Sequence, residues 1–188
     1  MAAVLYIDMG SPFVYLAVER LERFDFGDVE LRPVSLGALF KYAGRSSWGL
    51  SARREVGMAE VQARACAYGL PEVRWPDGWP SNYLQANRAA VAAAELGGLE
   101  VFVTTALRMA FVDAADLGND EVVLDAAARA GLDAALVQSL IASPVVKERL
   151  RASTDAAYAA GVRGVPTLEL GGRLFWGEDQ LEIAAANT

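Results

Sequence analysis

The sequence predicts an α/β fold in which a large block of helices interrupts a small sheet. Residues 1–35 read as strand, helix and strand, and strand-like patterns return after residue 161. Between these two parts, residues 36–160 contain no convincing strand. A chain of 188 residues, of which 54% are hydrophobic and 22% charged, is long and apolar enough to bury one compact core.

The N-terminal part predicts a parallel strand pair. Residues 3–8 are almost continuously apolar, which is typical of a strand buried on both faces. Residues 29–34 alternate, and Pro33 should end this strand or place it at a sheet edge. The helix between them begins at Ser11-Pro12 and carries apolar residues at helical spacing. A helical connection this short implies a right-handed parallel crossover.

The middle of the chain predicts a series of helices separated by glycine and proline breaks. Pro144 suits the first turn of a helix that Ser143 caps, and Gly161 ends that helix. The segment 76–80 reads as a loop. Helices are expected at residues 36–42, 51–68, 83–96, 100–114, 119–130, 134–142 and 144–160.

The chain closes with a predicted hairpin and a helix. Residues 167–170 and 173–176 are strand-like and flank Gly171-Gly172, which is a strong signal for a two-residue hairpin turn. Residues 178–186 are expected to form a helix with acidic residues in its first turn.

The order of these elements, once the helical block is set aside, is that of a thioredoxin-like sheet. The sequence therefore predicts a thioredoxin-like fold with a large inserted all-helical domain. The discontinuous thioredoxin-like domain is expected at residues 1–36 and 161–188, and the inserted helical domain at residues 37–160.

Composition excludes several classes of function. The formal net charge of -7 argues against nucleic-acid and anionic-lipid partners, and no apolar run is long enough to cross a membrane. The chain has no histidine, so Ser-His triads and most catalytic zinc sites are excluded and no metal is expected. Cys66 is the single cysteine, which excludes a Cys-x-x-Cys redox pair, and we expect it to be a small buried residue. Because the N-terminus also lacks a signal-peptide pattern, the protein is expected in the cytoplasm.

Two segments are candidates for one ligand site. Ser11 stands at the positive end of a helix, where it could hold an anion or serve as an ordinary N-cap. Pro166 starts a strand after a Gly-x-x-Gly turn, which fits a cis proline or a rigid turn. In a thioredoxin-like sheet this turn faces the first helix, which leaves the Val165 backbone free to pair with an extended, peptide-like ligand.

Two further groups leave alternatives open. Glu178 and Asp179 either complement the dipole of the last helix or form a site where amides bind a carboxylate and Asp179 binds an ammonium group. The tryptophans Trp48, Trp75 and Trp79 either line a cleft for a flat substrate or pack between the two domains.

Motifs with matching spacing run along essentially the whole chain. They are Ser-Pro-Phe-x-Tyr-Leu-Ala at 11–17, Leu-x-Pro with Leu-Gly-x-Leu-Phe-Lys at 31–41, Pro-Ser-Asn at 80–82, Gly-Val-x-Gly-Val-Pro-Thr at 161–167 and Trp-Gly-x-Asp at 176–179. As an ordered set they resemble the 2-hydroxychromene-2-carboxylate isomerases. That family is similar to kappa-class glutathione transferases, and both are serine-bearing relatives of periplasmic disulfide oxidoreductases.

The resemblance implies that glutathione binds in a cleft between the two domains. Ser11 matches the serine that hydrogen-bonds the glutathione sulfur, so the thiolate is the nucleophile and Ser11 is not. Val165, just before a cis Pro166, matches the backbone that pairs with the cysteinyl part. Lys41 matches a lysine that meets either a glutathione carboxylate or the acid group of the substrate. The γ-glutamyl end is assigned to Glu178 and Asp179.

The leading hypothesis is a glutathione-dependent isomerase acting on 2-hydroxychromene-2-carboxylate. Reversible thiolate addition, ring opening, bond rotation and loss of the thiol would give trans-o-hydroxybenzylidenepyruvate. The alternatives are a kappa-class-like glutathione transferase and a non-catalytic thiol- or peptide-binding protein. The expected partners are a small aromatic substrate and a low-mass thiol, which is glutathione or a similar compound, and the relatives suggest a homodimer.

The chain departs from the family pattern at three positions. Gln180 stands where the family has arginine, which removes a cation suited to a carboxylate. Arg45 follows Gly44 where the family usually has asparagine, and it either takes over an acidic group or indicates a different substrate. Ala65 follows Arg64 where the family has tryptophan.

Overall fold

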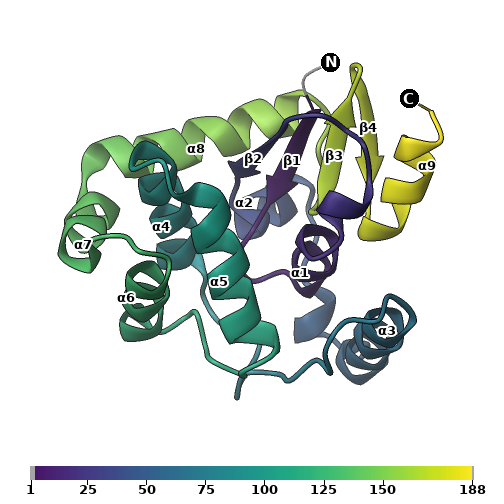
Figure 1. The fold of residues 1–188 in the computed structure, drawn as a ribbon, viewed down its shortest axis with the longest axis horizontal. Helices are drawn as coiled ribbons and strands as arrows, with labels where there is room; N and C mark the ends of the chain where they lie inside the picture. Colours follow the sequence, from purple (N-terminus) through teal and green to yellow (C-terminus); the bar gives the residue numbers. More distant parts are fainter. Residues whose placement is uncertain (1–2, 188) are drawn as a thin grey trace.

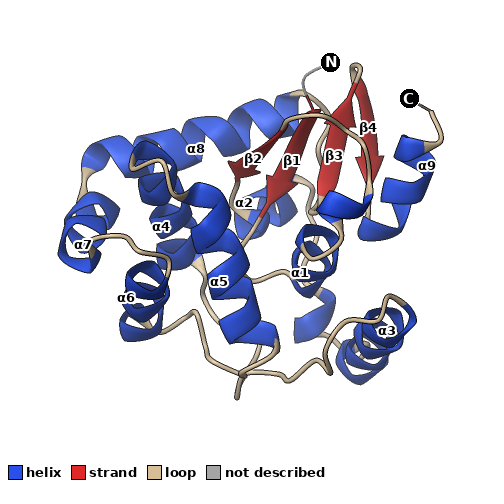
Figure 2. Ribbon diagram, viewed as in Figure 1, coloured by secondary structure: helices blue, strands red, loops and turns tan. Residues whose placement is uncertain are grey.

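A four-stranded mixed sheet forms one part of the computed structural model, which describes residues 3–187. The strand order is β2-β1-β3-β4 (Figure 2). The strand β1 (Ala3–Ile7) runs parallel to β2 (Val29–Pro33) and antiparallel to β3 (Thr167–Leu170). The strand β4 (Arg173–Trp176) pairs antiparallel with β3. This sheet, with a helical block between β2 and β3, confirms the predicted thioredoxin-like fold with a helical insertion.

The position of each strand follows from its sequence. All residues of β1 are buried, as its continuous apolar run predicts for a central strand. The strand β2 lies at the sheet edge and ends at Pro33, which has no N–H to donate to a further ladder. Between β3 and β4, Gly171 and Gly172 have φ values of 59° and 76°, which a type I′ hairpin turn requires.

The helical block contains the seven predicted helices, and their ends differ from the predicted ends by a few residues. Ser143 caps α8 as predicted, because its side chain accepts a hydrogen bond from the N–H of Val146. The first helix is α1 (Pro12–Val18), in the β1–β2 crossover. The helices of the block are α2 (Leu36–Tyr42), α3 (Arg54–Ala67), α4 (Leu84–Glu95), α5 (Leu99–Phe111), α6 (Asp120–Arg129), α7 (Ala134–Ala142) and α8 (Pro144–Ala159).

Within residues 3–187, three short 3₁₀ turns were not predicted from the sequence. Two of them are η1 (Leu21–Arg23) and η2 (Trp48–Leu50). The third, η3 (Glu178–Gln180), corrects the expected closing helix, because only α9 (Leu181–Ala185) is α-helical. In η3 the N–H of Gln180 donates to the carbonyl of Gly177, which is the tighter hydrogen-bond pattern of a 3₁₀ turn.

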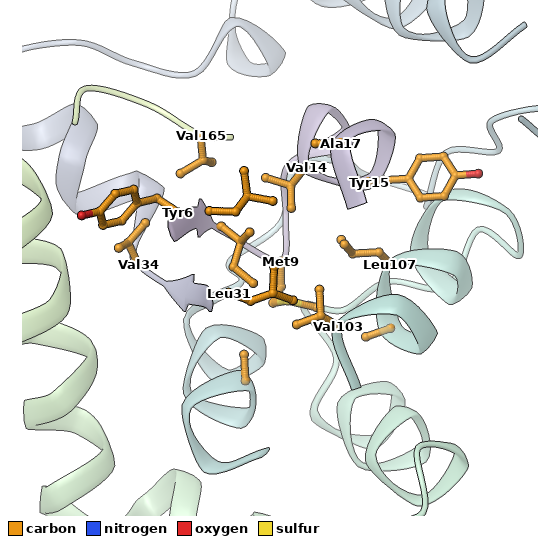
Figure 3. Packing of buried hydrophobic residues seen from close by; sticks show 14 of the residues in the cluster. Tyr6, Met9, Val14, Tyr15, Ala17, Leu31, Val34, Val103, Leu107 and Val165 are labelled. Carbon is orange, nitrogen blue, oxygen red and sulfur yellow. The ribbon is translucent and has the colours of Figure 1, made fainter. Parts of the chain in front are cut away.

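One hydrophobic core joins the sheet to the helical block. Figure 3 shows Leu31 of β2, Val14 and Tyr15 of α1, and Val103 and Leu107 of α5 in the same cluster. In Figure 1, helices α4 to α7 gather on one side of the sheet, whereas α3 lies apart from them. None of the helices within residues 3–187 is long and apolar enough to span a membrane.

Candidate functional site

A cavity of about 760 Å³ lies where the sheet meets the helical block. The turn after β1, helix α2 and its following loop, the segment before α4, the loop before β3 and the end of β4 all contribute to its wall. Tyr6 pairs with Thr167, so β1 ends beside the start of β3 and the segments that flank these strand ends meet here. The cavity is lined by all the predicted site residues, namely Ser11, Lys41, Val165, Pro166, Glu178 and Asp179.

Ser11 is the N-cap residue of α1 and is buried against the cavity. Its Oγ accepts a hydrogen bond from the N–H of Val14 at 3.4 Å, and Pro12 occupies the first turn. Within residues 3–187 its hydroxyl hydrogen has no acceptor. Ser11 therefore keeps one hydrogen-bond donor for a ligand in the cavity.

The buried carboxylate of Asp8 also lines the cavity and holds together the elements around Ser11. Its Oδ1 accepts from the N–H of Gly10 at 2.8 Å, and its Oδ2 accepts from the N–H of Leu36 at 2.8 Å and from Nδ2 of Asn87 at 2.7 Å. Burial raises the pKa of Asp8, and these three hydrogen bonds oppose the rise. Asp8 thus ties the turn after β1 to the first turn of α2 and to α4.

Asp8 and Asn87 are site residues to which the sequence motifs do not point. Asn87 accepts from the N–H of Met9 at 2.9 Å through Oδ1 while it donates to Asp8 through Nδ2, so both ends of its amide are used. A carboxylate that closes an apolar strand is one signal that could have identified the pair. A single buried amide side chain in an alanine-rich helix is the other.

Two glycines let aromatic rings approach the cavity wall. A Cβ on Gly10 would overlap the ring of Tyr83, and a Cβ on Gly164 would lie 2.6 Å from Nε1 of Trp176. Both rings line the cavity. Glycine is therefore needed at both positions for the rings to pack against the backbone beside the site.

The loop before β3 brings unpaired backbone groups to the cavity. The Val165–Pro166 peptide bond is cis, which confirms the cis-proline alternative for Pro166. Figure 3 shows the side chain of Val165 among the core residues. The N–H and C=O groups of Val165 make no hydrogen bond within residues 3–187, although the residue is buried. Buried backbone groups of this kind usually have a partner, and a ligand in the cavity could supply it.

The carboxylate of Glu178 is occupied by other parts of the protein. Its Oε2 receives hydrogen bonds from Arg20 and from the hydroxyl of Tyr68, each at 2.8 Å, and its Oε1 receives one from Arg64 at 2.5 Å. The Arg20 guanidinium also pairs with Glu182 and stacks on Tyr68 at 3.5 Å. The carbonyl of Glu178 also accepts from Arg20 at 3.3 Å, so a ligand contact of Glu178 would use its backbone N–H.

Asp179 is the more accessible of the two predicted acids, since about half of its side chain is exposed. It lies 3.5 Å from Arg64, which also lines the cavity. The position of Gln180 lacks the cation that the family pattern has there. The cation that lies close to Asp179 is Arg64, from α3.

Lys41 and Arg45 also line the cavity, from the end of α2 and from the loop that follows it. Neither side chain forms an ion pair within the described residues 3–187. The Arg45 guanidinium lies 5.0 Å from the ring of Trp176 and 5.4 Å from the ring of Phe40. The cavity therefore contains two cations without an acidic partner.

The three tryptophans form one aromatic cluster beside the cavity, and their binding of a flat substrate stays a prediction. Trp48 and Trp79 line the cavity, with ring centroids 4.9 Å apart. Trp75 packs behind them, 4.6 Å from Trp79 and 5.9 Å from Phe111 of α5. Cys66, by contrast, is exposed on α3, so the expectation of a buried cysteine was wrong. The helical face that carries Cys66 points away from the core, whereas the neighbouring Ala65 is buried.

Comparisons with known proteins agree with this architecture. The family model of the DSBA-like thioredoxin domain matches residues 3–187. A 2-hydroxychromene-2-carboxylate isomerase from Sphingobium xenophagum is 29% identical over 188 residues, which cover 95% of this chain and 93% of that protein. Glutathione S-transferase kappa 1 from Homo sapiens is 25% identical over 198 residues, with coverage of 96% and 88%.

The solved structures show the same fold. A structure of 2-hydroxychromene-2-carboxylate isomerase superposes with a TM-score of 0.88 at 23% identity, and the match covers 100% of this chain and 94% of that one. The chain therefore belongs to the family of DSBA-like thioredoxin domains, and within that family it resembles the 2-hydroxychromene-2-carboxylate isomerases over almost its whole length.

Proposed function

We propose that this protein is a glutathione-dependent isomerase that converts 2-hydroxychromene-2-carboxylate to trans-o-hydroxybenzylidenepyruvate. The observation that carries the proposal is the free hydroxyl donor of Ser11, which faces the same cavity as the unpaired Val165 backbone. No Cys-x-x-Cys pair is present in the sequence, so disulfide exchange is not the chemistry of this site. Relatives named as isomerases and as a glutathione transferase support an enzyme of this kind.

The residues around the cavity fit glutathione, which carries a thiol, a peptide backbone, an ammonium group and two carboxylates. Ser11 offers a donor to the sulfur, and Val165 offers both a donor and an acceptor to the peptide. Asp179 suits the ammonium group, and Lys41 suits either a glutathione carboxylate or the acid group of the substrate. The volume of about 760 Å³ lies within the ordinary range for small-molecule sites, ~300–1,000 Å³.

The residues of the protein would bind and orient glutathione and the substrate, and they would activate the thiol. When bound, glutathione supplies a thiol that adds to the unsaturated carbon of the substrate and is released again, so no net oxidation occurs. Ser11 donates its hydroxyl hydrogen toward the sulfur and so favours the ionised thiol. Lys41 holds an acid group, and the walls formed by Trp48 and Trp79 exclude water from the reacting carbon.

The same proposal includes the setting in which the enzyme works. The cavity would lie between the proposed thioredoxin-like domain, residues 1–36 and 161–188, and the proposed inserted helical domain, residues 37–160. A reduced thiol is available in the cytoplasm, which is the proposed location. The resemblance suggests a homodimer, and light scattering of the purified protein would establish its mass.

The test uses purified protein, glutathione and 2-hydroxychromene-2-carboxylate, with absorbance recorded against a reaction without enzyme. We expect Ser11→Ala to lose about 100-fold in rate, because a donor to the charged sulfur is removed. Ser143→Ala is the matched control, since Ser143 caps α8 but does not line the cavity. The proposal would be refuted if the wild-type protein gave no rate above the reaction without enzyme. Equal rates for Ser11→Ala and Ser143→Ala would also refute it.

A glutathione transferase is the second candidate, favoured by the similarity to glutathione S-transferase kappa 1. It would use the same site, but the thiol would stay attached to the electrophile. Mass spectrometry of the products separates the two functions, because a stable thioether forms only in the transferase reaction. Calorimetric binding of glutathione without turnover of either kind would indicate the non-catalytic thiol-binding protein.

A further inference from the structure

Some charged side chains that line the cavity have hydrogen-bond or ion-pair partners, and others form no ion pair. Asp8 is satisfied by neutral donors, and Arg64 forms ion pairs with both Glu178 and Asp179. Lys41 and Arg45 form no ion pair within residues 3–187. In a chain with a formal net charge of -7, these two cations without an acidic partner line one cavity. The charged residues that line the cavity are Asp8, Lys41, Arg45, Arg64, Glu178 and Asp179.

The C-terminal end of α2 brings Lys41 and Arg45 to the same cavity. Lys41 lies in the last turn of the helix. Gly44 then adopts φ 61°, in the left-handed region, and the N–H of Arg45 donates back to the carbonyl of Phe40 at 2.8 Å. This C-cap reverses the chain immediately after the helix, so that Lys41 and Arg45 line the same cavity.

The guanidinium of Arg45 is positioned by aromatic rings and not by acids. It lies over Phe40 and over Trp176, an indole that stands against Gly164 on the loop before β3. Stacking on rings leaves the N–H groups at the edge of the guanidinium plane available. No side-chain hydrogen bond of Arg45 is present in the part of the chain described, residues 3–187. The guanidinium of Arg45 is thus a planar donor at the cavity wall that can form two parallel hydrogen bonds.

The remaining wall suits a flat apolar group. The rings of Phe13, Trp48 and Trp79 line the cavity, and Phe13 packs edge-on against Trp48 at 6.1 Å. Aromatic walls of this kind bind a planar ring, whereas the cations bind its substituents.

We propose that the cavity takes a planar aromatic or conjugated substrate with two carboxylate groups, of which Lys41 binds one and Arg45 the other. The proposal rests on the proposed function in treating this cavity as the substrate site. It adds planar diacids to the monoacid of the proposed reaction as compounds that the cavity accepts, and it makes Arg45 a specificity-determining residue.

The test measures the binding of phthalate, isophthalate and terephthalate against benzoate by calorimetry, at fixed ionic strength and without thiol. At least one diacid is expected to bind about tenfold tighter than benzoate, the effect of one additional charge-assisted hydrogen bond. Arg45→Gln should abolish this advantage and leave benzoate binding almost unchanged. Arg45→Lys should keep part of it, because the charge remains but the planar fork is lost.

Arg53→Gln is the matched control. Arg53 is exposed and does not line the cavity, so its loss changes the net charge equally without touching the site. Equal affinities for diacids and benzoate, or a diacid advantage that survives Arg45→Gln, would overturn the proposal. A diacid advantage that disappears when S-methylglutathione is bound would also overturn it, because Arg45 would then serve the thiol compound.

The two proposals fail in different ways. Since the diacid measurements contain no thiol, they do not depend on isomerase activity. A diacid advantage in a protein that does not turn over 2-hydroxychromene-2-carboxylate would leave this inference standing and remove the isomerase assignment. Turnover of 2-hydroxychromene-2-carboxylate without a diacid advantage would support the isomerase assignment and overturn this inference.

Discussion

Two buried carboxylates border the cavity, and the protein satisfies them in opposite ways. Asp8 accepts hydrogen bonds from two backbone N–H groups and from the amide of Asn87, and no cation contacts it within residues 3–187. Glu178 accepts from two guanidinium groups and one phenol. The first arrangement positions backbone segments, whereas the second joins side chains from segments that are far apart in the sequence.

The difference has consequences for charge. Without a neighbouring cation, burial raises the pKa of Asp8. At Glu178, removal of the carboxylate would leave Arg20 buried next to a neutral group, since only 2% of the Arg20 side chain is exposed. The cluster around Glu178 should therefore be the more sensitive to loss of charge, whereas the stability that Asp8 contributes should depend on pH.

The largest effect is expected for Glu178→Gln. This change keeps the shape of the side chain but removes the negative charge that Arg20 and Arg64 share, and Arg20 keeps only its pair with Glu182. Breaking a buried ion pair from one side costs about 3 kcal/mol. Urea unfolding of the variant and the wild type measures the loss. If Glu178→Gln lowered the free energy of unfolding by less than Asp8→Asn does, the expected ranking of the two clusters would be wrong.

Asp8→Asn should destabilise the protein by about 2 kcal/mol, because the introduced NH₂ group cannot accept and one of the three donors loses its partner. The donors are the N–H groups of Gly10 and Leu36 and the Nδ2 of Asn87. Asp77→Asn, on the exposed loop before α4, is the control and should change the free energy of unfolding by less than about 0.5 kcal/mol.

The pH dependence of stability should reveal the contribution of Asp8. Because burial raises the folded-state pKa of Asp8 above its ordinary value of 3.8, the folded protein binds this proton more tightly than the unfolded chain. The stability contributed by Asp8 therefore falls as the pH rises from 3.8 to the raised pKa, and is level above it. Unfolding of wild type and Asp8→Asn from about pH 4 to about pH 7 isolates this term. The stability advantage of the wild type should shrink with pH, and an advantage that grows would contradict the assignment.

The smallest effect is expected for Glu60→Gln. Glu60 pairs with Arg64 at i,i+4 on the exposed face of α3, so the same guanidinium is involved as at Glu178. Exposed helical pairs contribute about 0.3–0.5 kcal/mol. Comparison of Glu60→Gln with Glu178→Gln by urea unfolding shows how much of the Arg64 interaction depends on burial. Equal losses would mean that burial of Glu178 adds nothing.

The fold was predictable because its signals are local. Pro33 ended a strand, Gly171-Gly172 formed the hairpin turn, and Ser143-Pro144 began a helix, as expected. Each signal acts through the conformation or hydrogen bonds of a few neighbouring residues. The short 3₁₀ turns lacked such signals, because a single turn has too few residues to show a period.

The candidate site was predictable only in part. Motif spacing pointed to Ser11 and Val165, and the structure places both at one cavity, while their roles stay predictions. The partners of Glu178 could not be anticipated, because Arg20 is 158 residues away in the sequence and Arg64 is 114. Asp8 and Asn87 are likewise 79 residues apart. Contacts at such separations follow from the tertiary structure and leave no local pattern.

The shared carboxylate of Glu178 also couples two motions. Helix α3 lies apart from the other helices of the block and carries both Arg64 and the cavity wall that Arg64 forms (Figure 1). For α3 to undock, Arg64 must leave Glu178, which weakens the hold on η3 and on α9 behind it. Amide hydrogens in α3 and α9 should therefore exchange with solvent together, because the part of the cavity wall that Arg64 forms is coupled to the docking of α9.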